Sequence, residues 1–298
     1  MDYHDEIKNH NSKLLFIIFF CLLFGYILLK NIQSSVFLMA KDRVNVVFYG
    51  QNTTFYSLGK NDVSYFFTLS PNVEMLVPGS YGYYRLGALG KLISLEKKPD
   101  LLKKVFSGAT SSFVDLYFFP SKPTIYYGET EEGKSPFSLI DIFMNNSNGN
   151  VIDRLFLWLN LVQRQEGQDK KINNIPIKKE GQRLIYDYEK FHKDYQGFFY
   201  KKTHRNLKDN VQIIYTKSYK TADLLSMIIE GEGIRVVDLT EKKMENNQCL
   251  IIENQEKNIS QSAKDLSLFF NCSLKKGPTE VSDIILILGD LERKWTIE

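Results

Sequence analysis

The sequence LLFIIFFCLLFGYILL occupies residues 14–29 and lies between Lys13 and Lys30. As a helix it would be about 24 Å long, at about 1.5 Å per residue, slightly less than the roughly 30 Å hydrocarbon core of a bilayer. The two flanking lysines can extend their ammonium groups to the interface and close that gap. No position in the run supplies the polar face that a helix on a soluble core needs. We therefore predict a transmembrane anchor at residues 14–29, after a short tail at residues 1–13.

The residues that follow the run indicate that the anchor is retained. Leu-Met-Ala at residues 38–40 puts a leucine where signal peptidase prefers a small residue, so we expect no cleavage there. Basic residues flank the run on both sides, so the charges alone leave its orientation open.

Composition limits the function of the rest of the chain. The 298 residues carry a net charge of +3, with 24% charged and 43% hydrophobic residues, which is typical of a globular protein. This charge is too small to indicate a nucleic-acid partner, and no DNA-binding pattern is present, so we expect none. The four histidines have no metal-ligand spacing, which argues against a zinc hydrolase.

The three cysteines do not make a disulfide framework, because Cys21 lies in the apolar run. Cys249 and Cys272 could pair in an oxidising compartment. The sequence favours the alternative, two unpaired buried thiols.

The rest of the chain has the pattern of a mixed α/β protein in two parts. In residues 43–200 we predict strands at 44–49, 63–69, 73–77, 113–119 and 124–127, helices on either side of Pro99, a loop at 165–182, and an amphipathic helix from Leu184 to Phe198. Residues 201–209 are a polar connector, which we take as the domain boundary. In residues 210–298 we predict two β-α-β units, with strands at 211–215, 234–237, 249–252 and 284–288 and helices at 221–230 and 260–270.

Residues 151–162, VIDRLFLWLNLV, form the most apolar helix after the anchor. Leucine, phenylalanine and tryptophan side chains occupy both of its faces, so we expect burial on both sides or contact with an apolar ligand. A helix of the protein core is the simpler interpretation, and the segment is too short to be a second membrane span.

Residues 128–135, GETEEGKS, match the phosphate-binding loop G-x-x-x-x-G-K-[ST]. In such a loop, backbone N–H groups surround a polyanionic phosphate. Here Glu129, Glu131 and Glu132 would place three negative charges beside it. We therefore interpret the match as an acidic surface turn.

Residues 78–87, PGSYGYYRLG, form a second candidate site. Glycines let the backbone approach a ligand, Tyr83 and Tyr84 offer hydroxyls and ring faces, and Arg85 is a bidentate phosphate donor. Lys60 and Asp62 precede a neighbouring predicted strand and could reach the same rim. The alternative is a turn decorated with tyrosines.

The order of these parts resembles the LytR-CpsA-Psr (LCP) family of cell-envelope proteins followed by a LytR C-terminal domain. The resemblance is carried in the first part by RVNVVFYG, KNDVSYFFTLSP, VEMLVPG, YRLGALGKL and FVDLYFF, and in the second by VQIIY, TADLLSMIIEGEGIRVV and DIILILGD. It implies a membrane-anchored LCP-like α/β domain at residues 43–200 and a small α/β LytR C-terminal-like domain at residues 210–298.

The resemblance also implies a location and a chemistry. The N-terminus would be cytoplasmic and the bulk of this single-pass protein extracytoplasmic at the cell membrane. Members of the family use Mg²⁺ to transfer glycopolymers from polyprenyl pyrophosphate to peptidoglycan. The resemblance implies Asp62 and Arg85 as the catalytic residues, with Asp62 also as the metal ligand, and Arg154 is a loose match to a family arginine. We add Arg154 to the residues expected to bind the substrate. The others are Lys60, Tyr83 and Tyr84, from the pattern described above, and Trp158, from the apolar helix at residues 151–162.

Two departures from the family pattern decide between the resulting hypotheses. Pro78, Gly79 and Ser80 stand where the family has an arginine, and of a later arginine cluster only loose matches such as Arg154 remain. Losing one donor of this kind commonly costs about 10²- to 10³-fold in rate. We therefore expect a protein that binds the glycopolymer or its polyprenyl carrier, with catalysis impaired or absent. An active transferase and a protein-binding envelope adaptor are the alternatives.

Overall fold

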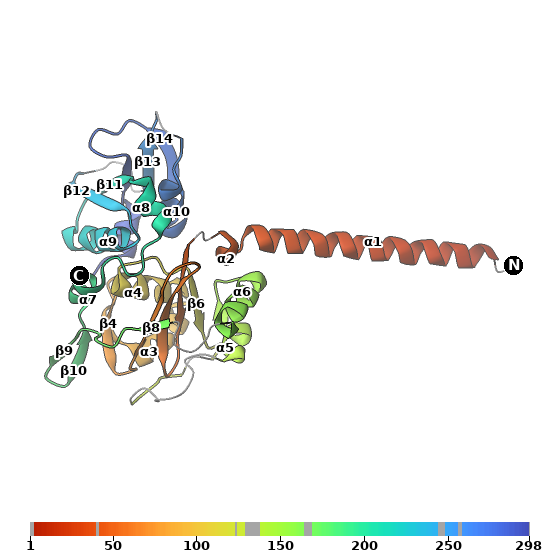
Figure 1. The fold of residues 1–298 in the computed structure, drawn as a ribbon, viewed down its shortest axis with the longest axis horizontal. Helices are drawn as coiled ribbons and strands as arrows, with labels where there is room; N and C mark the ends of the chain where they lie inside the picture. The colour runs from red at the N-terminus through yellow and green to blue at the C-terminus, as the bar shows by residue number, and fades with distance from the viewer. Residues whose placement is uncertain are drawn as a thin grey trace.

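The computed structural model describes residues 3–39, 42–122, 124–128, 138–163, 169–243, 248–255 and 258–297. Its first element is the long helix α1 (Tyr3–Gln33), which projects from the folded body (Figure 1). Within α1, residues Phe16–Gln33 have a mean hydropathy of 1.9, and none of them is buried. α1 is therefore long and apolar enough to cross a membrane, and no other helix in the described ranges is.

The first unit of the body contains a six-stranded sheet with the order β7-β6-β1-β2-β3-β8. Its strands are β1 (Arg43–Phe48), β2 (Thr53–Gly59), β3 (Ser64–Leu69), β6 (Leu116–Phe119), β7 (Asn146–Ser147) and β8 (Asp169–Lys171). β1 is buried along its whole length and pairs with β2 antiparallel and β6 parallel. The sequence did not predict β2, because Thr53, Thr54 and Ser57 interrupt its apolar pattern. The structure buries all three and pairs two of their hydroxyls, Thr54 with Thr68 and Ser57 with Asn45.

A four-stranded sheet completes the first unit, with the order β5-β4-β10-β9. Its strands are β4 (Val73–Val77), β5 (Gly82–Arg85), β9 (Ile177–Glu180) and β10 (Arg183–Tyr186), and the associated helices are α3 (Leu86–Glu96), α4 (Asp100–Thr110) and α7 (Tyr188–Tyr195). These helices and both sheets enclose one hydrophobic core, which includes Phe55, Phe106 and Tyr186.

Several sequence predictions for this unit are wrong. The segment from Leu184 to Phe198 is not one helix, because the side chain of Asp187 caps α7 and the residues before it form β10. Residues 165–182 contain β8 and β9 as well as loop, and residues 78–87 contain β5. Residues 124–127 form no strand, although the N–H of Tyr126 donates to the carbonyl of Gly87. Residues 129–135 of the phosphate-loop match lie outside the described residues.

Three helices cover the other face of the six-stranded sheet (Figure 1). They are α2 (Val36–Met39), α5 (Leu139–Met144) and α6 (Val151–Val162), and they share a second core with alternate residues of β1. α6 has the predicted bounds. Of the two alternatives expected for it, burial on both sides is wrong, and contact with an apolar ligand stays a prediction. Only Asp153 and Leu157 are buried, because the sheet covers one side of the helix alone.

The second unit is built on a five-stranded sheet with the order β12-β11-β15-β13-β14, above the first unit in Figure 1. Its elements, with the connector helix that precedes them, are α8 (Lys202–Leu207), β11 (Asn210–Tyr215), α9 (Tyr219–Gly231), β12 (Arg235–Glu241), β13 (Leu250–Asn254), α10 (Gln261–Phe270), β14 (Ser273–Gly277), β15 (Ile284–Ile287) and α11 (Asp290–Lys294). The units β11-α9-β12 and β13-α10-β14 each join two parallel strands. We had predicted that the second of the two β-α-β units ends with the strand at residues 284–288. That strand is β15, which lies in the centre of the sheet between β11 and β13. The true partner, β14, was missed because Leu274 is its only large apolar residue.

Cys249 and Cys272 form a disulfide, so the expectation of two unpaired thiols is wrong. Each cysteine directly precedes one of the adjacent parallel strands β13 and β14, whose register begins with Leu250 opposite Ser273. This register brings the two Cα atoms within 4.9 Å of each other. The pairing could not be predicted while the partner strand of β13 was misassigned.

Candidate functional site

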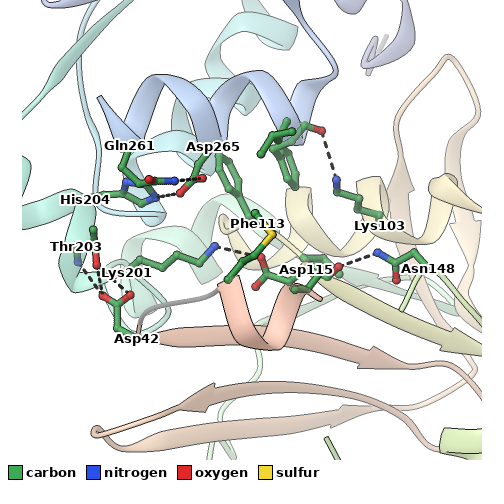
Figure 2. A pocket seen from close by; sticks show the side chains of 15 residues that line it. Asp42, Lys103, Phe113, Asp115, Asn148, Lys201, Thr203, His204, Gln261 and Asp265 are labelled. Atoms are coloured by element: carbon green, nitrogen blue, oxygen red, sulfur yellow. Dashed lines mark hydrogen bonds and ion pairs between the residues drawn. The ribbon is translucent and has the colours of Figure 1, made fainter. Parts of the chain in front are cut away.

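A cavity of about 290 Å³ lies where the two units, the connector and α2 meet (Figure 2). Its walls combine apolar side chains with buried charges, the combination that small-molecule sites require. The lining residues include Val36 and Met39 of α2, Lys103 of α4, Phe113 and Asp115 before β6, Lys201 and His204 of the connector, and Asp265, Leu268 and Phe269 of α10. A wider cleft of about 610 Å³ lies between the connector and α9, but it is lined mainly by charged and polar side chains such as Arg205, Glu230 and Arg235.

Lys201 lies at one side of the cavity and joins the two units. Its ammonium nitrogen lies 3.1 Å from Asp115 of the first unit and 2.7 Å from Glu232 of the second. Burial works to lower the pKa of Lys201, but the two carboxylates outweigh it and hold that pKa above its ordinary value. Glu232 is fully buried and also accepts the backbone N–H of Phe113 at 2.9 Å. This cluster fixes the position of the connector against both units.

A second pair of contacts positions the start of α8. The carboxylate of Asp42, just before β1, accepts the backbone N–H of Thr203 at 2.7 Å and also its hydroxyl. A carboxylate at the first turn of a helix satisfies an otherwise unpaired backbone donor. The segment that leads from α2 into the first sheet therefore also holds the connector helix.

His204 and Asp265 form the wall of the cavity opposite α2. The Nε2 atom of the buried His204 lies 3.2 Å from the carboxylate of Asp265, and Gln261 donates to that carboxylate at 2.8 Å. Burial works to raise the pKa of Asp265, but the hydrogen bonds from His204 and Gln261 lower it below its ordinary value. Figure 2 shows these three side chains interacting with one another. The carboxylate of Asp265 is therefore held by two contacts within the wall.

Lys103 differs from the other cations of the cavity. Its ammonium group donates to the carbonyl of Phe269 at 3.3 Å and lies 4.1 Å from the centre of that residue's ring. Among the described residues, no carboxylate lies within ion-pair distance of it. Burial lowers the pKa of Lys103. The cavity therefore offers one partly desolvated cation beside apolar walls, which suits an amphiphile with an anionic group.

The predicted residues Lys60 and Asp62 lie together, in the turn between β2 and β3. Lys60 donates to the carbonyl of Phe37 in α2 at 2.6 Å. Asp62 lies 3.3 Å from Arg43 and 3.1 Å from Lys202. Burial works to raise the pKa of Asp62, but the N–H of the next residue and the two cations lower it. Both side chains connect structural elements, and neither lines the cavity.

The other predicted residues lie in two further places. On β5, Arg85 stacks 4.4 Å from the ring centre of Tyr127, Tyr84 packs on the core, and Tyr83 lines a shallow groove beside Lys178. On α6, Arg154 donates to the carbonyls of Ile142 and Asn145, and Trp158 packs against the core beneath the helix. The structure thus brings Lys60 and Asp62 together, and Tyr83 to Arg85 together, but it does not unite them in one site.

Sequence reasoning did not find the cavity residues because they are far apart in the chain. Lys103, Asp115, Lys201 and Asp265 come from four different elements, and Lys201 was interpreted only as part of a polar connector. The sequence did contain one indication of the cavity. The aromatic residues Phe113 and Phe269 lie near these charged residues, and aromatic side chains are uncommon on a solvated surface.

Comparison with known proteins identifies no family for this chain. No protein-family model and no curated protein matches the chain. One solved structure does, a crystal structure described as the transcriptional regulator yvhJ from Bacillus subtilis. The match has 11% sequence identity and a TM-score of 0.36, and it covers 53% of this chain and 97% of that one. A likeness at this level carries no argument about fold or function.

Proposed function

We propose that this chain is a membrane-anchored, extracytoplasmic cell-envelope protein of LytR type, and that it binds the polyprenyl carrier of a cell-wall glycopolymer in the cavity between its two units. The observation that carries the proposal is the position of Lys103, a partly buried cation among apolar side chains, in a cavity that α2 also lines. α2 begins three residues after α1 ends, at Val36 after Gln33. A ligand in this cavity is therefore close to the membrane in which its prenyl chain would lie.

The charges of the cavity select the chemical class of the ligand. Lys201 is paired with two carboxylates, and the ring of His204 already contacts Asp265, so neither side chain is free for an anionic ligand. Lys103 has only a carbonyl and a ring face, both of which a phosphate oxygen can supplement or replace. Val36, Met39 and Leu268 then offer apolar contacts to the chain that follows the phosphate.

The disulfide supports the proposed location. Disulfides persist in oxidising compartments and are rare in the cytosol. Cys249 and Cys272 are both buried in the second unit, where they join adjacent strands. This favours the orientation in which the N-terminus of α1 is cytoplasmic and the folded body is outside.

The donor set around Asp62 does not fit the Mg²⁺ site that the family resemblance implies. Both of its neighbours within ion-pair distance are cations, Arg43 and Lys202, and a metal ion there would have to displace them. In the described part of the chain, no three histidine, cysteine or carboxylate side chains form a group that could hold a metal ion. We therefore favour binding over transfer and derive no catalytic step.

The proposal is tested by binding of polyprenyl phosphate to the full chain in nanodiscs, with the uncharged polyprenol as the reference ligand. Removing a charge-assisted contact costs about 1.5–3 kcal/mol, so Lys103→Met should weaken binding of the phosphate about 10- to 150-fold. Binding of polyprenol should not change. Lys91→Met, an exposed lysine of the neighbouring helix α3, is the matched control. Equal affinities in the Lys103 variant and the native chain would contradict the proposed site.

A further inference from the structure

The outer face of α5 and α6 is an apolar surface without exposed charge. Its exposed large side chains are Leu139, Ile140, Phe143, Met144, Val151, Leu155, Phe156 and Val162. In α6 the exposed positions Val151, Leu155 and Val162 are spaced by about one and two helical turns, so they lie on one side of the helix. Such a surface on a folded domain marks a site of interaction.

The charged residues of the two helices all have hydrogen-bond partners within the fold. Asp141 and Asp153 close capping boxes at the starts of α5 and α6. Arg154 donates to carbonyls at the end of α5 and lies 5.5 Å from the ring centre of Phe118 in the sheet. Placing the outer face in an apolar medium would therefore bury no unpaired charge.

The start of α6 is held directly against the end of the anchor helix. The side-chain amide of Asn150 donates to the carbonyl of Asn31 at 2.8 Å and to the hydroxyl of Ser34 at 3.1 Å. The carboxylate of Asp153 accepts the hydroxyl of Ser35 at 2.7 Å and the N–H of Phe37 at 3.0 Å. These contacts fix the face of α5 and α6 relative to α1.

The length of the anchor sets the depth of that contact. The apolar stretch Phe16–Gln33 has 18 residues, about 27 Å of helix at about 1.5 Å per residue, so it nearly fills a roughly 30 Å hydrocarbon core. Its last turn, which contains Asn31, must then lie at the membrane surface, and α6 begins at that level. Figure 1 shows α5 and α6 at the edge of the body from which α1 projects.

We infer that α5 and α6 lie on the phospholipid bilayer, with their exposed apolar side chains in the interfacial layer beside the anchor. An apolar helix face in this layer binds in proportion to the area that it buries. The contact would hold the body against the membrane instead of leaving it free on a tether. The inference rests on one part of the proposed function, that α1 spans the membrane, and is independent of any ligand in the cavity.

The experiment uses the full chain in phosphatidylcholine–phosphatidylglycerol vesicles, with a fluorescent probe on one cysteine at a time. Ile140→Cys and Val151→Cys, in a Cys21→Ser background, place the probe on the outer face. Leu95→Cys on α3 is the control, because Leu95 is 67% exposed and the two test positions are each 68% exposed. The natural Cys21 reports independently on insertion of α1. Quenching is measured with lipids that carry a nitroxide near the head of the acyl chain.

We expect loss of fluorescence at positions 140, 151 and 21 and none at position 95. Phe156→Asp should reduce the loss at position 151, because a carboxylate does not enter the interfacial layer readily. Quenching at Cys21 without quenching at 140 and 151 would overturn the inference and leave the anchor intact. Absence of quenching at Cys21 would overturn both. If the fluorescence of the probes at 140 and 151 changed with protein concentration and was not quenched by the nitroxide lipids, the face would contact a second copy of the chain. That result would also overturn the inference.

Discussion

Replacing Lys201 should destabilise the junction between the two units more than any surface charge does. In Lys201→Met, the partly buried carboxylate of Asp115 and the buried carboxylate of Glu232 lose the cation that lies 3.1 Å and 2.7 Å from them. Removing one partner of a buried ion pair leaves the other uncompensated and typically costs about 3–5 kcal/mol. The adjacent Lys202 is a matched control, because its side chain is 49% exposed and pairs with Asp62 at the surface. Lys202→Met should cost about 0–1 kcal/mol.

The assay is urea unfolding of the full chain in detergent micelles, followed by tryptophan fluorescence. Trp158 in the first unit and Trp295 in the second are the two tryptophans of the chain, so both units contribute to the signal. Adding Glu232→Gln to Lys201→Met should recover part of the lost free energy of unfolding, since one uncompensated carboxylate is then removed. A cost for Lys201→Met no greater than that for Lys202→Met would refute this view of the junction.

Three further outcomes follow from the same structure. The lowered pKa of Asp265 means that its stabilisation is present above its ordinary pKa of 3.8 and is lost as the pH falls below that value. Stability measured between neutral and acid pH should therefore decline less steeply in Asp265→Asn, and parallel curves would contradict the assignment. Reducing the disulfide between Cys249 and Cys272 should lower the free energy of unfolding by about 3 kcal/mol. The control is Cys21→Ser, which should lose the same amount on reduction as the native chain. In α6, Leu157→Ala should cost about 2–5 kcal/mol and Leu155→Ala clearly less, because only the first side chain is buried. Equal costs would show that Leu155, like Leu157, packs within the protein core.

The fold was predictable where a local pattern is repeated without interruption. The apolar run at residues 14–29, the strand at residues 44–49 and the unit β11-α9-β12 all follow from periodicity alone. β2 was not predictable, because the buried hydroxyls of Thr54 and Ser57 are satisfied by residues on neighbouring strands. β14 was missed because it lies at the edge of its sheet, where the strand needs few apolar residues. Misassigning β14 then hid the disulfide.

The candidate site was less predictable than the fold. Lys60, Asp62 and Arg154 were selected for their charge, but in the structure they connect elements of the scaffold. Charges that hold tertiary contacts have the same sequence signature as charges that bind ligands. Lys201 forms ion pairs with carboxylates, whereas Lys103 contacts a carbonyl and a ring. This difference is decided by the packing of segments that are far apart in the chain.

The most direct test of the proposed binding site is photo-crosslinking with a polyprenyl phosphate that carries a photoreactive group in its prenyl chain. The full chain in nanodiscs is irradiated, and the modified peptides are identified by mass spectrometry. We expect labelling in α2 and α10, around Met39 and Leu268. Excess unlabelled polyprenyl phosphate should suppress this labelling, and Lys103→Met should reduce it. Labelling confined to the β5 groove beside Tyr83, or labelling that no competitor suppresses, would contradict it.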